Sequence, residues 1–328
     1  MKMGYFMSLK ESMMVSPYNK FSIFLKNKYG EKVYKIPLKI KGTCPNRLIF
    51  GKSCAFCGDE GGSFENLDEN IPLKDQLYQN IEYISNKYRA KKFIGYYQNY
   101  TNTFVDFTYF KNMIDVCIRK DIVAIYISTR PDAITDEQLE FLSNVKYNNN
   151  IDIVLELGLQ SINYKTLKRI NRGHSLAQYI YTVNKCRNFN IDICTHLIFG
   201  LPGDNKEDVV EAAKILSALK TQQVKIHSLY ILENTDFGNL YKKGELKLIS
   251  KDDYVDWVIT FLEYLDPSVV VQRLIGRSPE DVSLFSNWDT SWWKIVDSIE
   301  RVMNENGLKQ GDKFNYLEPI KYKKGGKK

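Results

Sequence analysis

Short runs of β-branched and aromatic residues recur along the chain, and longer stretches with helical periodicity separate them. The runs predict strands at residues 33–40, 93–98, 122–128, 152–158, 191–199 and 224–231. The stretches between them predict helices within 102–120 and at 135–145, 176–188 and 206–220, where Thr135 and Gln138 have capping-box spacing. Pro37 places the first strand at a sheet edge or at its own end. This alternation predicts a parallel sheet with helical crossovers.

The pattern changes after residue 231. Residues 252–265 and 288–306 predict helices, and residues 269–271 predict a short strand. We expect an α/β fold, a partial (β/α)6 TIM-like barrel with an α-rich C-terminal extension. The expected divisions are a segment at 1–32 that packs on the barrel, a core at 33–232, the extension at 233–310 and a disordered basic tail at 311–328. Chemistry in such folds lies at the carboxyl ends of the strands.

The net positive charge is concentrated at the C-terminal end of the chain. Hydrophobic residues make up 44% and charged residues 26%, which is ordinary for a soluble globular protein. The formal charge of +7 falls to +2 without the last eight residues, KYKKGGKK, which hold five lysines and no acid. Such a tail is more often solvated than bound to RNA or a membrane surface, and we expect no DNA partner.

No segment of the sequence predicts export or membrane insertion. The first 16 residues lack the apolar core of a signal peptide, and no run approaches the length of a membrane span. We therefore expect a cytoplasmic protein with no membrane partner. Thiols stay reduced in the cytoplasm, so clustered cysteines there more often indicate metal binding or catalysis than disulfides.

Three of the six cysteines lie together in residues 42–62, GTCPNRLIFGKSCAFCGDEGG. Nine residues separate Cys44 from Cys54, and two separate Cys54 from Cys57. Three thiolates can bind three irons of a cubane cluster and leave the fourth iron open. A structural zinc site needs a fourth protein ligand, and no histidine lies nearby, while a thioredoxin-like pair would not need Cys44. The other cysteines are isolated and fit small buried positions: Cys117, Cys186 and Cys194.

This pattern, with the aromatic Phe56 before the last cysteine, resembles radical S-adenosylmethionine (SAM) enzymes. The long first gap is similar to that of the radical SAM domain in the Elongator catalytic subunit. The chain resembles in particular a family of uncharacterised bacterial radical SAM proteins related to that domain, from residue 18 to residue 285. The resemblance rests on VYKI (33–36), TCPNR (43–47), YYQNYTNT (96–103), STRPD (128–132), LELGLQS (155–161), RINRGH (169–174), HLIFGLPG (196–203) and QRLIGRSPED (272–281).

The resemblance implies a barrel of the radical SAM type and two cofactors. A [4Fe-4S] cluster would be bound by Cys44, Cys54 and Cys57, and SAM would bind its open iron. The implied reaction is reductive cleavage of SAM to methionine and a 5′-deoxyadenosyl radical, which abstracts hydrogen from a substrate. The electron would come from a reductant such as flavodoxin or ferredoxin.

The resemblance leaves more than one substrate class open. The Elongator likeness points to a base of transfer RNA or another RNA. A likeness to oxygen-independent coproporphyrinogen oxidase points to a small metabolite or cofactor precursor. The non-enzymatic alternatives are an iron–sulfur sensor and a zinc-stabilised RNA-binding protein, and SAM-site residues on several strands disfavour both.

Phe56 of the cysteine loop and several residues near the ends of the predicted strands are expected to contact SAM. Gln98, Asn102 and Thr103 could bind the ammonium group of its methionine moiety. Gln160 and Arg172 match positions that contact SAM in coproporphyrinogen oxidase and its relatives. The planar fork of an arginine is suited to the SAM carboxylate, because it can bind both oxygens.

The third to fifth predicted strands carry further candidates. Ser128 stands where coproporphyrinogen oxidase has a carboxylate for the SAM ribose, and Glu156 is a possible substitute. By alternation Glu156 points into the barrel, where it needs a partner such as Arg130. His196 stands where relatives have an aspartate near SAM, although an isolated strand histidine is equally a core residue.

The remaining candidates are weaker. Gly200 and Pro202, in the turn GLPG, would let the backbone approach the adenine. His227 and Tyr96 could face the substrate. The tryptophans of the last predicted helix are expected to pack rather than to stack on bases: Trp288, Trp292 and Trp293.

Overall fold

The computed structural model describes residues 16–58, 66–278 and 281–319. Of the tail predicted to be disordered at 311–328, residues 320–328 lie outside the described residues. Residues 311–319 instead contact the body of the protein: the Gly311 amide donates to the Leu262 carbonyl at 3.0 Å, and the Tyr316 hydroxyl donates to the Tyr264 carbonyl at 2.7 Å. The strands are β1 (Val33–Leu38), β2 (Lys92–Tyr97), β3 (Ile122–Thr129), β4 (Asp152–Gln160), β5 (Asp192–Phe199), β6 (Gln223–Ser228), β7 (Ile231–Leu232), β8 (Val270–Arg273) and β9 (Ser283–Phe285). The helices are α1 (Phe21–Tyr29), α2 (Pro45–Ile49), α3 (Leu73–Tyr88), α4 (Phe107–Asp115), α5 (Asp136–Asn149), α6 (Tyr164–Arg169), α7 (Leu176–Asn188), α8 (Lys206–Ala218), α9 (Asp236–Lys242), α10 (Lys251–Tyr264), α11 (Trp292–Glu305) and the short 3-10 helix η1 (Asn287–Asp289).

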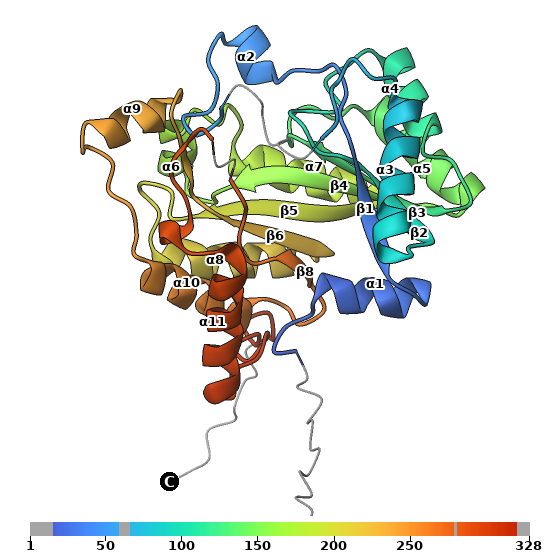
Figure 1. The fold of residues 1–328 in the computed structure, drawn as a ribbon. Coiled ribbons are helices and arrows are strands. Elements are labelled where there is room, and N and C mark those ends of the chain that lie inside the picture. The colour runs from blue at the N-terminus through green and yellow to red at the C-terminus, as the bar shows by residue number, and fades with distance from the viewer. Residues whose placement is uncertain (1–15, 59–65, 279–280, 320–328) are drawn as a thin grey trace, which may run out of the picture.

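Seven strands form one parallel sheet in the order β1-β2-β3-β4-β5-β6-β8, curled as an open half-barrel (Figure 1). β1 is an edge strand, as Pro37 predicts. The sequence predicted a barrel of six strands, whereas this sheet has seven. The run that we predicted inside the extension becomes β8, because α10 carries the chain back to the sheet and Val271 pairs in parallel with Val224 of β6. The α/β half-barrel is otherwise confirmed.

The two faces of the sheet have different environments. In β3, Ile125 and Ile127 belong to the large apolar core under the outer helices, while Ala124 and Tyr126 face inward. The inner face is filled with apolar residues near the amino ends of the strands, where Leu25 of α1 joins this inner cluster and Phe21 packs on Tyr126 with ring centroids 6.1 Å apart. Nearer the carboxyl ends, polar side chains replace this packing.

The N-terminal segment closes the gap between the two edge strands. The Val271 amide of β8 donates to the Asn19 carbonyl at 2.8 Å, and Lys35 of β1 donates to the Gln272 side chain at 2.7 Å. In Figure 1, α1 lies across the ends of β1 and β8. These contacts give the half-barrel a closed floor at the end opposite the cysteine loop.

The C-terminal extension packs along one side of the sheet, with α10 against α8 and α11 against α10. The helix expected at 288–306 begins only at Trp292, because η1 precedes it. Trp288 of η1 packs on Tyr254 and Phe285, as expected, and its indole donates to the Ile249 carbonyl at 2.9 Å. Among the described residues, no helix combines the length and apolar character that crossing a bilayer requires.

Candidate functional site

The three clustered cysteines line one cavity of ≈ 870 Å³ at the carboxyl ends of the strands. Cys44 caps the amino end of α2 directly after β1, and Cys54 and Cys57 follow in the loop beyond α2. The Cys57 amide donates to the Cys54 carbonyl at 2.9 Å, so these two residues share a tight turn. All three are free thiols. The fold therefore brings the predicted ligands to the place where a TIM-like barrel carries its chemistry.

Each of these sulfurs has a guanidinium beside it. Arg130 lies 3.8 Å from Cys44 Sγ, Arg172 lies 3.7 Å from Cys54 Sγ, and Arg47 lies 3.9 Å from Cys57 Sγ. Three cations around three sulfurs stabilise thiolates and the negative charge of a thiolate-bound cluster. We call these six residues the cysteine group. The donor set therefore fits a [4Fe-4S] cluster with three protein ligands.

Neighbouring residues hold two of these arginines in place. Arg130 binds Asp132 through two nitrogens at 2.9 and 2.7 Å and donates to Asn46 Oδ1 at 2.6 Å. Arg172 donates twice to the Gly158 carbonyl, at 3.1 and 2.6 Å. A Cβ on Gly158 would meet Arg172 Nη2 at 2.6 Å, so glycine leaves room for this arginine. Preorganised cations of this kind tune bound metal groups.

The expected pairing of Arg130 with Glu156 is wrong. Arg130 does not pair with Glu156, because Asp132 two residues further on takes its guanidinium. Sequence reasoning also missed Asn46 and Arg47, although both lie in the quoted stretch TCPNR. Asn46 donates to the Asn171 carbonyl at 2.6 Å and thereby ties the cysteine loop to the turn before Arg172.

The local charges affect the thiols differently. Burial opposes ionisation of Cys44, but the Asn46 amide and the Arg130 charge lower the pKa of this thiol. Burial raises the pKa of Cys57 to about 11 despite Arg47. A metal bound by the Cys57 sulfur would have to displace this proton.

Seven of the residues predicted to contact SAM line the same cavity. They come from the cysteine loop, from four strands or their ends and from the turn before α7: Phe56, Gln98, Ser128, Glu156, Gln160, Arg172 and His196. Gln160 has a φ of +77°, which non-glycine residues rarely adopt. Tyr96 and His227, expected to face the substrate, also line it, and so does Trp292, which we expected only to pack.

Four other predicted contacts do not line the cavity. Asn102 donates to the carbonyls of Tyr97 and Ser128, at 3.1 and 2.9 Å, and Thr103 bonds the Thr129 hydroxyl at 2.6 Å. Both side chains therefore brace the loop after β2 instead of lining the cavity. In the turn after β5, Gly200 has a φ of +88° and packs beside Ile249, and Pro202 forms a bridge with Asp204. That turn supports the C-terminal extension.

Deeper in the cavity, Glu156 is fully buried and accepts bonds from several side chains. Lys35 donates to Oε1 at 2.8 Å. Lys225, Tyr96 and His196 reach Oε2 at 2.6, 2.9 and 2.9 Å, and Ser128 reaches it at 3.3 Å. We call Glu156, Lys35, Lys225, Tyr96 and His196 the Glu156 cluster. Burial would raise the pKa of Glu156, but the charges of Lys225 and Lys35 hold it well below its usual range.

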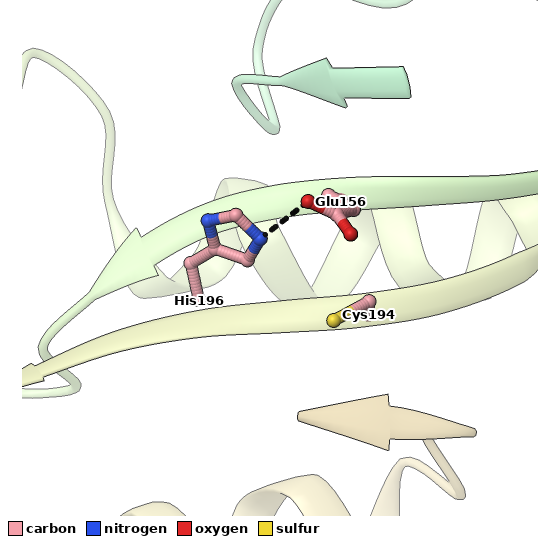
Figure 2. Close-up of side chains that lie close together, drawn as sticks. All are labelled: Glu156, Cys194 and His196. Carbon is pink, nitrogen blue, oxygen red and sulfur yellow. Dashed lines mark hydrogen bonds and ion pairs between the residues drawn. The ribbon is translucent and has the colours of Figure 1, made fainter. Parts of the chain in front are cut away.

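The geometry of Glu156, Cys194 and His196 superficially suggests a metal site. Their ligand atoms lie within 4.8 Å of one another (Figure 2). However, Lys35 and Lys225 already neutralise the carboxylate, and their charges would repel a metal cation. Burial and the Lys225 charge lower the pKa of His196 to about 4, so the neutral ring donates its Nε2 proton to Glu156. This group is complete without a metal.

The chain belongs to the radical SAM superfamily. The sequence model of that superfamily matches residues 39–216, and the model of the radical SAM C-terminal domain matches residues 221–305. Members use a [4Fe-4S] cluster and SAM, so these are the cofactors of this enzyme.

Relatives extend the comparison over nearly the whole chain. The uncharacterized protein MJ0486 of Methanocaldococcus jannaschii is 34% identical and aligns over 90% of this chain and 91% of its own length. The tRNA uridine(34) acetyltransferase of Methanocaldococcus infernus is 26% identical over 62% of this chain and only 37% of its own. The solved structure of Elp3 from the latter organism has a TM-score of 0.65 and 20% identity, and covers 85% of this chain and 64% of that one. This structural likeness shows a shared fold.

Proposed function

We propose that this enzyme cleaves SAM reductively at a [4Fe-4S] cluster held by Cys44, Cys54 and Cys57, and that the resulting 5′-deoxyadenosyl radical abstracts hydrogen from a substrate in the cavity. The observation that carries the proposal is the cysteine group, in which three thiols each have a guanidinium within 3.9 Å at the edge of one cavity. The cluster supplies the electron for bond cleavage; the chain binds SAM, orients it and excludes water.

The residues proposed to hold SAM surround this group. Arg172 offers its fork to the carboxylate, and Gln98 and Gln160 offer amides to the amino acid moiety. Ser128 and Phe56 lie in the same cavity and would contact the ribose and the adenosine. A one-electron reductant such as flavodoxin or ferredoxin would supply the electron.

For the substrate, the first proposal is a base of transfer RNA or another RNA. Its support is the likeness to the tRNA uridine(34) acetyltransferase, which acts on tRNA by its name. That likeness covers 37% of the acetyltransferase, so most of the latter protein has no counterpart in the alignment.

The second candidate is a small metabolite, and the cavity favours it. Trp292 and Val296 of α11 and Arg273 of β8 line the cavity together with the cysteines, so the extension forms part of the wall of the proposed substrate space. Among the described residues of this lining, cationic side chains outnumber acids, which suits an anionic small molecule.

The radical chemistry is tested by iron content and by SAM cleavage. Anaerobically reconstituted protein should bind about four irons per chain, as a [4Fe-4S] cluster requires, and dithionite with SAM should give 5′-deoxyadenosine. Cys44→Ala and Cys57→Ala should lose both properties. Cys186→Ala, which changes a buried cysteine outside the cavity, should keep both. Full iron in Cys57→Ala would refute the ligand assignment.

The two substrate classes are separated in cells. A deletion strain should lack one modified nucleoside in its tRNA if the substrate is an RNA base. An unchanged nucleoside profile together with an accumulated metabolite would favour the small molecule.

A further inference from the structure

The cavity wall away from the cysteine loop carries an arginine whose guanidinium has no partner among the residues that the structure describes. Arg273 ends β8 and lines the cavity. Across residues 16–58, 66–278 and 281–319, no hydrogen bond or ion pair engages its guanidinium. The other arginines of this cavity have partners: Arg47, Arg130 and Arg172 lie on the cysteine sulfurs, and Arg277 stacks on Trp292 at 4.7 Å.

A histidine with an unused nitrogen lies on the neighbouring strand. His227 Nε2 is buried without a hydrogen-bond partner among the described residues, and the side chain lines the same cavity. Gly276 lets the chain lie against this ring, because a Cβ there would meet Nδ1 at 2.8 Å. A buried polar nitrogen without a partner costs free energy, which a bound ligand could recover. In its Nε2–H tautomer, His227 can donate to such a ligand.

The charges on this side of the cavity are not balanced. Glu156 is the one carboxylate among the described residues that line the cavity, and Lys35 and Lys225 already pair with it. Arg273 pairs in register with Lys225 across β6 and β8, so its charge adds to an excess of cations. Partly enclosed positive charge without a counter-charge favours an anionic ligand.

We propose that Arg273 and His227 form a subsite that binds an anionic group of the substrate, either a carboxylate or a phosphate. This inference rests on the proposed function in one respect: it takes the bound molecule to be the substrate of the radical reaction. The planar fork of Arg273 can donate to two oxygens of either group, and His227 can donate to a further lone pair. The subsite would fix one end of the substrate and leave its remaining part toward the cysteine group.

Ligand-observed NMR on the reconstituted full-length enzyme tests this subsite. SAM is kept saturating, so that its own carboxylate occupies the SAM site. The probes are inorganic phosphate and acetate, and acetamide is the neutral counterpart of acetate. We expect one or both anions to bind and acetamide not to bind. Arg273→Gln should weaken anion binding at least about tenfold, as loss of a charge-assisted bond predicts. Arg273→Lys should retain part of it.

Matched variants make the outcome decisive. Arg301→Gln makes the same change at an exposed position of α11 and should leave anion binding unchanged. Preferential binding of phosphate would identify a phosphate-bearing substrate, including a nucleotide, and preferential binding of acetate would identify a carboxylate. Failure of both anions to bind, or equal binding by Arg273→Gln with a native circular dichroism spectrum, would overturn the subsite.

The same samples separate this inference from the proposed function. Arg273→Gln should keep full iron content and native SAM affinity, because the cysteine group is intact. If wild type binds no cluster yet shows Arg273-dependent anion binding, the radical proposal fails and the subsite stands. If the cluster forms and SAM is cleaved while Arg273→Gln binds anions like wild type, the subsite alone fails.

Discussion

The cysteine group and the Glu156 cluster both place cationic side chains beside buried or half-buried acidic groups, but they differ in completeness. Glu156 already meets two ammonium groups and two further donors at 2.6–2.9 Å. The cysteine group instead places three guanidiniums beside three sulfurs, and one of these guanidiniums, that of Arg130, also pairs with Asp132. The Glu156 cluster is electrostatically complete within the protein, whereas we propose that the cysteine group binds a cofactor. Changes in the two should therefore affect different properties.

The largest effect on stability should come from removing the charge of the Glu156 cluster. Glu156→Gln keeps the side-chain shape but leaves Lys35 and Lys225 without a counter-charge. We expect the free energy of unfolding to fall by about 3–5 kcal/mol, as breaking a buried pair does. Urea unfolding of the anaerobic protein measures this. Asp256→Asn, which breaks an exposed pair with Lys206, should cost less than about 1 kcal/mol. Equal losses in the two variants would contradict a structural role for Glu156.

The pH dependence of stability should reveal the neutral histidine of the same cluster. His196 has a pKa of about 4 in the folded protein and 6.5 as its ordinary value. The unfolded chain therefore takes up a proton below pH 6.5 that the folded protein does not, and stability falls as pH drops toward 4. The full effect is about 3 kcal/mol. Urea unfolding between pH 7.5 and 5.5 should show a shallower fall in His196→Gln. An unchanged slope would contradict the burial of a neutral ring.

A pair of strand glycines should separate stability from cofactor binding. A Cβ at Gly158 would meet Arg172 Nη2 at 2.6 Å, and one at Gly95 would meet Cys117 Sγ at 2.5 Å. The Arg172 tip can move, so Gly158→Ala should cost little stability but displace the guanidinium from Cys54. We expect iron or SAM affinity to fall about 10–100-fold. Gly95→Ala should instead lose about 1–3 kcal/mol of stability through overpacking and keep its iron. Iron retained by Gly158→Ala and lost by Gly95→Ala would contradict this distinction between the two glycines.

Much of the fold follows from local sequence patterns. Helix α7 has the predicted bounds, and the Thr135 capping box is present. Helix α3 was missed, although Leu73, Leu77, Ile81 and Ile84 recur along it with helical spacing and pack on the core. β8 was predicted as a strand, yet its place in the sheet depends on the path of α10, which periodicity does not encode.

The site was less accessible to sequence reasoning than the fold. The spacing of Cys44, Cys54 and Cys57 predicted a shared position because it needs only a single loop. The partners of Glu156 come from residues 121 positions earlier and 69 positions later, so strand order decides them. The local pair of Arg130 with Asp132, by contrast, was visible in STRPD.

The variant with the smallest expected effect, Ser128→Ala, tests whether Ser128 belongs with the cysteine group or with the Glu156 cluster. Its hydroxyl reaches Glu156 at 3.3 Å, the longest of the five bonds to that carboxylate, and it also lines the cavity. Glu156 keeps four shorter bonds without it, so Ser128→Ala should cost at most about 1 kcal/mol of unfolding free energy. If Ser128 binds SAM, equilibrium binding should show several-fold weaker SAM affinity with unchanged stability. A larger stability loss with native SAM affinity would place Ser128 with the Glu156 cluster, because a hydroxyl that serves only the carboxylate has no effect on a ligand beyond it.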